Sequence, residues 1–328
     1  MPNIHSSQTS IALVKERMDL VSGSSRLWIG FWTWVLVMAT TTACFAQAPK
    51  KRPGEKEERP FQIVAIETKD GVRLRAAYFP SDKEKDAVPV LIVHEWGGQA
   101  SPYLRLGLAL KKAGCAVLIP ELRGHGASNK YTTLSGGEEE FDLSKMGQAD
   151  VALMLSRDLE SCKGFLKEKN DAGELNLNAL TLIGVKEGAA LAAEWAIADW
   201  NFPSLGSKKQ GQDVRAMIYV SPEELHKGVR LDKTFRDRFV WRLPTLIIAG
   251  KGSPEMGAAN TVHDRLEKMR KKARMTDEEA NKMFLANASL SGANLIQNDP
   301  AVTTEIVNFI NSQVLTNILK FRWINRSE

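Results

Sequence analysis

Cysteine is scarce in this chain of 328 residues, which contains only Cys44, Cys115 and Cys162. Three cysteines exclude a disulfide-stabilised scaffold and provide no paired C-x-x-C zinc ligands. Histidine is scarce too, and the five histidines form no H-x-x-x-H pair. We therefore predict no metal ion, and no motif in the sequence implies an organic cofactor.

An excess of charge of one sign is also missing, because 44 Lys and Arg residues face 39 Asp and Glu residues, for a net charge of +5. Neither basic stretches interleaved with aromatic residues nor internal repeats occur, so we predict no nucleic-acid partner. The 24 glycines and 13 prolines follow no collagen-like period. With 43% hydrophobic and 25% charged residues, the chain can form an ordinary globular domain.

The N-terminus has the layout of a secretory signal. Arg26 precedes an apolar run at 27–38, and small residues then lead to Ala46 and Ala48. We predict a signal peptide at 1–46 and export to the periplasm or the exterior. An uncleaved anchor is the alternative, although four threonines make 27–46 a poor membrane helix. The segment Thr-Thr-Ala-Cys44 resembles a lipoprotein processing site, so a lipid anchor at Cys44 is a minor option.

Two further regions follow the predicted signal. Residues 47–60 are charged and punctuated by prolines, which is typical of an exposed linker. Residues 61–328 carry apolar runs and form the predicted folded domain.

Strand and helix patterns alternate through this domain. Lys69, Asp70 and Gly71 separate runs at 61–68 and 72–80, which predicts a β-hairpin. Short, almost continuous apolar runs predict buried parallel strands, and the segments between them have helical periodicity. The predicted strands are 89–94, 116–120, 180–183, 214–220, 244–249 and 283–290, and the predicted helices are 103–113, 143–159, 187–197, 261–275 and 302–319. This order predicts an α/β fold, with about eight strands in a mostly parallel sheet and helices on both faces.

Two loops, at 94–98 and at 120–128, each follow a predicted strand. The segment His94, Glu95, Trp96, Gly97, Gly98 is similar to the H-E-W-x-G loop of dienelactone hydrolases. The segment 120–128, PELRGHGAS, is similar to the P-D-x-R-G-x-G-x-S turn of the α/β-hydrolase superfamily. The resemblance extends from Phe61 to Leu319 and implies an α/β-hydrolase fold, with 94–98 forming an oxyanion loop or the wall of a ligand cleft.

The resemblance also implies a nucleophile at a tight strand-to-helix turn with the motif G-x-S-x-G. The corresponding elbow consists of Gly184, Val185, Lys186, Glu187 and Gly188. Lysine therefore occupies the nucleophile position, and no G-x-S-x-G or G-x-C-x-G occurs elsewhere in the chain.

The other triad positions are altered too. Ser253 stands where the resemblance implies an acid, with Glu255 as a shifted carboxylate. Ser291 stands where it implies a histidine, and no histidine follows residue 263. Acyl transfer needs a nucleophile, a base and a group that orients the base. Because removing the nucleophile or base costs about a millionfold in turnover, these positions predict a degenerate triad.

Each remaining candidate residue has a structural and a catalytic interpretation. Lys186 as a nucleophile would need a pKa about three units below its usual 10.4, and a solvated substitution is the simpler interpretation. Glu95 is interpreted as a hydrogen-bonded loop carboxylate, and Trp96 as a pocket wall or a core residue. Arg123 and His125 are expected to fix their loop. His226 is a candidate replacement base, and His263 is expected on a helix facing water.

We therefore predict an exported and catalytically inactive protein that binds a small ligand in the residual cleft, or contacts an envelope protein of unknown identity. The alternative is an ester or lactone hydrolase with an unconventional site, in which Glu95 or Glu255 activates water with His94 or His226. A structural protein without a working cleft is a third interpretation.

Overall fold

The computed structural model describes residues 60–327 except 134–135, 204–208, 276 and 278–279. The predicted signal at 1–46 and all but the last residue of the predicted linker at 47–60 lie outside the described residues.

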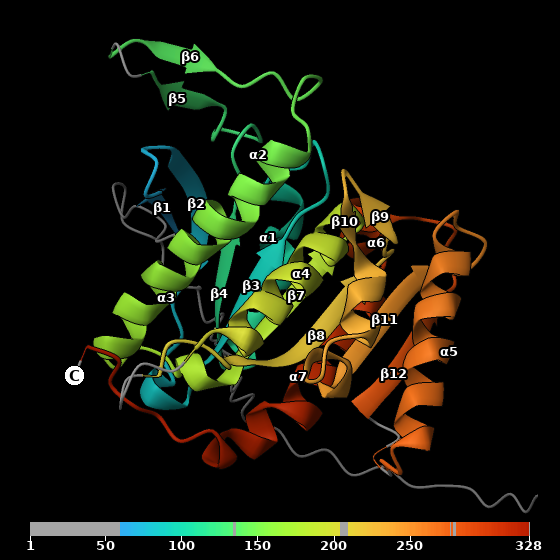
Figure 1. The fold of residues 1–328 in the computed structure, drawn as a ribbon. Helices are drawn as coiled ribbons and strands as arrows, with labels where there is room; N and C mark the ends of the chain where they lie inside the picture. The colour runs from blue at the N-terminus through green and yellow to red at the C-terminus, as the bar shows by residue number, and fades with distance from the viewer. Residues whose placement is uncertain (1–59, 134–135, 204–208, 276, 278–279, 328) are drawn as a thin grey trace, which may run out of the picture. The chain divides into compact units, whose positions relative to one another are not determined.

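The main sheet has eight strands in the order β1-β2-β4-β3-β7-β8-β11-β12 (Figure 1). Its strands are β1 (Gln62–Glu67), β2 (Arg73–Phe79), β3 (Val88–Val93), β4 (Cys115–Pro120), β7 (Leu180–Val185), β8 (Val214–Val220), β11 (Thr245–Gly250) and β12 (Asn281–Ala286). β2 pairs antiparallel with both β1 and β4, and every other pairing in this sheet is parallel. The predicted β-hairpin and the mostly parallel sheet are confirmed.

Seven α-helices are described in the chain. They are α1 (Leu104–Lys112), α2 (Gln148–Leu153), α3 (Glu160–Asp171), α4 (Glu187–Asn201), α5 (Met256–Lys272), α6 (Gly292–Asn298) and α7 (Pro300–Gln313). Short two-stranded pairs form between β5 (Lys130–Thr132) and β6 (Glu138–Glu140), and between β9 (Leu225–His226) and β10 (Val229–Arg230). Within the described residues, no helix combines the length and apolar character needed to cross a membrane.

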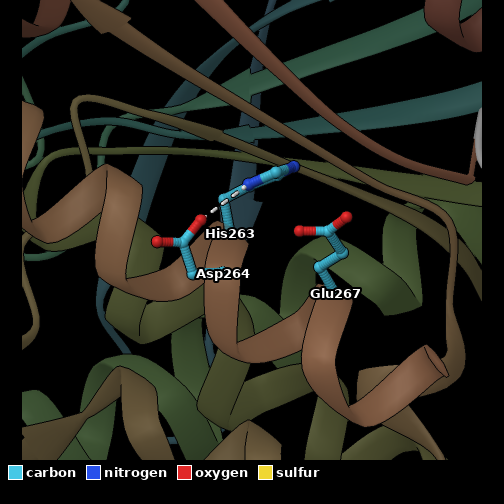
Figure 2. Close-up of side chains that lie close together, drawn as sticks. All are labelled: His263, Asp264 and Glu267. Atoms are coloured by element: carbon cyan, nitrogen blue, oxygen red, sulfur yellow. Dashed lines mark hydrogen bonds and ion pairs between the residues drawn. The ribbon is translucent and has the colours of Figure 1, made fainter. Parts of the chain in front are cut away.

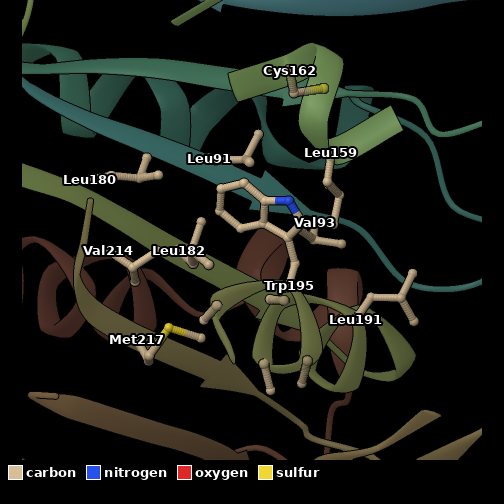
Figure 3. Packing of buried hydrophobic residues seen from close by; sticks show 14 of the residues in the cluster. Leu91, Val93, Leu159, Cys162, Leu180, Leu182, Leu191, Trp195, Val214 and Met217 are labelled. Atoms are coloured by element: carbon tan, nitrogen blue, oxygen red, sulfur yellow. The ribbon is translucent and has the colours of Figure 1, made fainter. Parts of the chain in front are cut away.

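The buried residues form two apolar clusters, one on each face of the sheet. Leu91 and Val93 of β3 point into one cluster, whereas Val90 and Ile92 point into the other, as the period of two in a strand requires. Trp195 of α4 fills the first cluster and packs among apolar side chains of the strands and of the neighbouring helix (Figure 3). Its indole N–H donates to Glu160 Oε1 at 2.7 Å, so its polar atom is not left unpaired.

Three of the predicted helices have other bounds in the structure. The helix predicted at 261–275 is α5, which begins earlier, at Met256, and ends at Lys272. The helix predicted at 143–159 begins instead at Gln148, because the Asp142 carboxylate accepts hydrogen bonds from Ser144 and holds that segment in a turn. A π-helical segment, Met154–Leu159, then joins α2 to α3, so helical structure continues to Asp171. The last helix was predicted at 302–319, but α7 starts at Pro300 and gives way to a 3₁₀ segment after Gln313.

Candidate functional site

The expected elbow lies where β7 meets α4. β7 ends at Val185, α4 begins at Glu187, and Lys186 between them has φ 48° and ψ −117°. The Lys186 N–H donates to the Val220 carbonyl at 2.9 Å. A Cβ atom at Gly188 would collide with the carbonyl oxygens of β3's carboxyl end, so glycine allows the helix to approach the sheet. The tight strand-to-helix turn is thus present with lysine at its corner.

The backbone of Lys186 is strained, which predicts a difference between two small substitutions. A positive φ disfavours any residue with a Cβ, whereas glycine adopts it without steric cost. Both Lys186→Gly and Lys186→Ala remove the same side-chain contacts. We expect the glycine variant to unfold with a free energy about 1 kcal/mol higher than the alanine variant in urea denaturation. Equal free energies of unfolding for the two variants would show that the backbone of Lys186 is not strained.

The Lys186 ammonium is ion-paired. Its Nζ lies 3.2 Å from Glu255 Oε1 and 3.5 Å from Glu223 Oε1. Partial burial lowers the pKa of Lys186, but contact with Glu255 and the charges of Glu187 and Glu223 outweigh that effect and leave the pKa above its usual value. A protonated amine has no lone pair with which to attack a carbonyl. This geometry therefore opposes the nucleophile interpretation of Lys186.

The other two altered positions also lie near this corner. Glu255 is the residue just before α5, and Ser291 is the residue just before α6. Burial raises the pKa of Glu255, but the nearby Ser291 hydroxyl, a backbone hydrogen bond and Lys186 lower it further, so the pKa lies below its usual value. Ser253 is buried, and its Oγ has no hydrogen-bond partner among the described residues. The structure thus places a Lys-Glu ion pair where a triad is expected.

Both ring nitrogens of His94 form hydrogen bonds with the backbone. Its Nδ1 lies 2.7 Å from the Glu95 carbonyl oxygen, and its Nε2 accepts the Leu122 N–H at 3.1 Å. These contacts define a neutral ring with the proton on Nδ1. Burial, followed by the neighbouring His125, lowers the pKa of His94 to about 3. With both nitrogens occupied, His94 has no free lone pair for a substrate or water.

This burial predicts a specific dependence of stability on pH. Because the pKa of His94 falls from 6.5 to about 3 on folding, the unfolded chain binds an extra proton between those values. Stability is therefore lost as pH falls below about 6.5. We expect His94 alone to lower the free energy of unfolding by about 2 kcal/mol between pH 7 and pH 5. Urea titrations of wild type and His94→Gln measure this, and an equal fall in both would contradict it.

The rest of the loop makes close contact with the elbow helix. The Trp96 N–H donates to Glu187 Oε2 at 3.1 Å, and Glu95 Oε2 accepts the Ala293 N–H at 3.0 Å. Gly97 has φ 73°, and the Gly98 N–H closes the turn onto the Glu95 carbonyl at 2.9 Å. An oxyanion hole needs free N–H donors at the place where negative charge develops. Here the Trp96 donor is already bound to a carboxylate.

Trp96 sits between two histidines. Its ring centroid lies 4.8 Å from that of His125 and 4.6 Å from that of His226. Burial is the main cause that lowers the pKa of each histidine below its usual value. The Nε2 atoms of His125 and His226 are buried without a hydrogen-bond partner in the described part of the chain. Trp96 is thus both a packed ring and part of the cleft wall.

The loop residue Arg123 is held from two sides. Its guanidinium donates to Asp70 of the first hairpin at 2.8 Å and to Asp158 of the π-helical segment at 2.6 Å. Both Arg123 and Asp158 are buried. Arg123 therefore has the loop-fixing role that the sequence suggests.

The cavity at the elbow is small and polar. It has a volume of about 220 Å³ and is lined by Glu95, Trp96, Lys186, Glu187, Ser291 and Asn294. Ligand pockets for drug-sized molecules are typically about 300 Å³ or larger, so this cleft fits only a small molecule. A larger cavity of about 700 Å³ lies elsewhere, along β1 and α3.

Three residues of the site were missed from the sequence. Glu223 reaches Lys186, Asn294 lines the cavity, and the Ser221 Oγ accepts the Gly292 N–H at 3.0 Å. Ser221 and Glu223 directly follow β8, and the carboxyl ends of parallel strands meet at one edge of the sheet. This edge rule was the signal that could have identified them.

One cluster among the described residues has the donor atoms for a metal ion. His263, Asp264 and Glu267 of α5 bring their ligand atoms within 4.8 Å of one another (Figure 2). This group contains no pair of histidines, and its histidine and glutamate are one helical turn apart. Asp264 is 77% exposed, and His263 Nδ1 is already 3.3 Å from its carboxylate. Three neighbouring side chains on one helix do not by themselves make a site.

Comparison of this chain with solved structures identifies its fold. Neither a protein-family model nor a curated protein matches the sequence. Among solved structures, a Pyrococcus furiosus esterase matches with a TM-score of 0.53 and 16% identity, covering 77% of this chain and 91% of that one. A dienelactone hydrolase from Anabaena variabilis matches with a TM-score of 0.52 and 18% identity, covering 78% and 100%. The protein has the α/β-hydrolase fold.

A carboxyl esterase from Bacillus coagulans gives a similar match, with a TM-score of 0.53 and 13% identity, covering 78% of this chain and 99% of that one. The fold that the sequence resemblance implies is thereby confirmed. At such identities the α/β-hydrolase fold is what the neighbours share with this chain, and fold does not carry function with it.

Proposed function

We propose that this protein is an exported α/β-hydrolase-fold protein that binds a small molecule in the elbow cleft without forming an acyl-enzyme. The observation that carries the proposal is the ion pair between Lys186 and Glu255 at the corner where a nucleophile would stand. The hydrogen bond from the Trp96 N–H to the Glu187 carboxylate also supports the proposal. A carboxylate beside a developing oxyanion would destabilise the negative charge of that oxyanion. Export is supported by the signal-like composition of residues 1–46.

A second candidate function is hydrolysis of an ester or a lactone. The structural neighbours favour it, since their names describe esterases and a dienelactone hydrolase. In this chain the reaction would need water activated by a carboxylate or by His226, because His94 has no free nitrogen. Burial lowers the pKa of His226, and its ring centroid lies 4.6 Å from that of Trp96 in the cleft wall, so His226 is the candidate base.

Steady-state assays with p-nitrophenyl acetate, p-nitrophenyl butyrate and a dienelactone separate the two functions. The binding function predicts release at the rate seen with a matched concentration of an unrelated protein, and no difference between wild type and His226→Gln. Saturable turnover that His226→Gln or Glu255→Gln abolishes would establish the hydrolase function. A thermal-shift screen of small molecules then identifies ligands, and a Trp96→Ala variant should lose their stabilising effect.

A further inference from the structure

One buried arginine differs from the other buried cations of this protein. Four Lys or Arg side chains are buried in the described part of the chain, and three of them, Arg123, Lys163 and Arg326, are ion-paired with buried aspartates. The fourth is Arg270 of α5, which is only 4% exposed and has no carboxylate partner among the described residues. Because an uncompensated buried charge is costly, this guanidinium calls for a counter-ion.

Most of the hydrogen-bond donors of Arg270 are unused. Its Nη2 donates to the carbonyl oxygen of Leu243, shortly before β11. Its Nε and Nη1 are buried and have no hydrogen-bond partner in the part of the chain that the structure describes. Burial lowers the pKa of Arg270, and Asp277 opposes this effect only as a charge at longer range. Unpaired N–H groups on a buried guanidinium therefore point to an acceptor that the chain does not provide.

Arg270 lines a cavity at the far edge of the sheet from the elbow. The cavity has a volume of about 610 Å³ and is also lined by Asn281, the first residue of β12. α5 and β12 lie side by side, and Asn281 Nδ2 donates to the His263 carbonyl oxygen of that helix at 3.4 Å (Figure 1). The cavity thus lies at the amino-terminal ends of β11 and β12, whereas the elbow follows the carboxyl end of β7. Its volume is large enough for a small organic molecule.

The described residues that line this cavity carry net positive charge. Arg270, Lys271 and Arg274 are its cations, and Glu267 and Asp277 are its carboxylates. The Lys271 ammonium already lies 2.6 Å from a Glu267 oxygen. One net positive charge therefore remains, which a ligand with a single negative charge would neutralise.

We propose that this cavity binds a small organic monocarboxylate, whose oxygens accept hydrogen bonds from Nε and Nη1 of Arg270. Arginine suits this ligand because its planar guanidinium holds several N–H donors in fixed directions, and such charge-assisted bonds to a carboxylate are strong. The ligand would supply both the counter-ion and the acceptors that Arg270 lacks. This site is separate from the elbow cleft and does not depend on the function proposed for that cleft.

Calorimetric titration of the full-length chain at low ionic strength tests the ligand class. Benzoate and benzylammonium have the same ring and opposite charges, so their comparison isolates the sign of the charge. We expect saturable binding of benzoate that weakens as salt is added, and no binding of benzylammonium. No saturable binding of benzoate at millimolar concentration would overturn the proposal, and so would tighter binding of inorganic phosphate or of benzylammonium.

Three variants locate the bound carboxylate. Arg270→Met keeps an apolar side chain but removes the guanidinium, and we expect benzoate to bind at least about tenfold more weakly. Arg274→Gln removes an exposed cation of the same cavity, and we expect a loss of about threefold. Lys112→Gln removes an exposed charge of the same sign from α1, outside the cavity, and should leave the affinity for benzoate unchanged.

Thermal unfolding provides an independent readout. Without ligand, Arg270→Met should melt at the temperature of wild type or above it, because an apolar side chain replaces an unpaired buried charge. Benzoate should raise the melting temperature of wild type and leave that of Arg270→Met unchanged. A ligand-free Arg270→Met protein that is unfolded, or that melts well below wild type, would show that the chain itself already compensates Arg270 and would overturn the proposal.

The position of the site has its own contrary outcome. Equal affinities for benzoate in wild type and Arg270→Met would place the carboxylate elsewhere. Loss of benzoate binding in Trp96→Ala, with Arg270→Met unaffected, would place it in the elbow cleft. Either result would overturn the site at Arg270.

Discussion

Replacing Arg123 by methionine should destabilise the protein by about 3–5 kcal/mol. Methionine keeps much of the apolar volume but removes every donor of the guanidinium. Asp158, which is fully buried, would then lose its ion-pair partner, and Asp70 in the first hairpin would lose its bidentate contact. An uncompensated buried carboxylate is among the most costly single defects in a folded protein. Urea unfolding monitored by circular dichroism measures the change.

Two further variants test whether the loss of stability depends on how deeply the ion pair is buried. Asp70 is one-third exposed, so Asp70→Asn should cost less than Arg123→Met. Arg230→Ala removes an exposed contact with Asp232, and we expect little change in stability. If Arg123→Met and Arg230→Ala had the same stability, the buried network would have no net role in holding the loop.

Gly188→Ala should destabilise the protein by about 3 kcal/mol or more. A Cβ atom at this position would collide with the carbonyl oxygens of Val93 and His94. These are backbone atoms at the end of a central strand, so neither can move aside without shifting β3 or the N-terminus of α4. The same shift would open the elbow that positions Lys186.

Gly164→Ala in α3 is the matched control. A Cβ atom there has open space around it, and alanine favours the helix over glycine by up to about 1 kcal/mol. We expect Gly164→Ala to be as stable as wild type or more so in the same urea titration. A Gly188→Ala protein within about 1 kcal/mol of wild type would show that the helix does not press on the sheet as described.

The strands of the sheet could be predicted well from the sequence, because a buried parallel strand is a short run of consecutive apolar residues. The apolar runs at 89–94, 180–183 and 214–220 correspond to β3, β7 and β8. The helix after Leu159 was not predicted, because α3 contains many charged residues and follows a π-helical segment. That segment contains Asp158, whose partner Arg123 is 35 residues away, and local patterns hold no information about such a pairing.

In the candidate site, too, the local features could be predicted from the sequence and the long-range contacts could not. Motif spacing was enough to place Lys186 at the elbow and His94 in the adjoining loop. The contacts that give these residues their chemistry are not local. Glu223 and Glu255 reach Lys186 from the ends of two other strands, and Leu122 fixes the ring of His94. Sequence spacing could therefore indicate an altered triad, but not the ion pair that occupies its place.

Competitive labelling of the lysines with acetic anhydride between pH 6 and pH 11, resolved by peptide mass spectrometry, tests the central claim most directly. We predict that Lys186 gains reactivity only above the usual pKa of lysine, because Glu255 and its neighbours hold the proton on Nζ. A Lys186 that reacts with a midpoint near pH 7 and faster than the exposed lysines would be a nucleophile at the elbow, which would contradict the ion pair as the resting state of this residue.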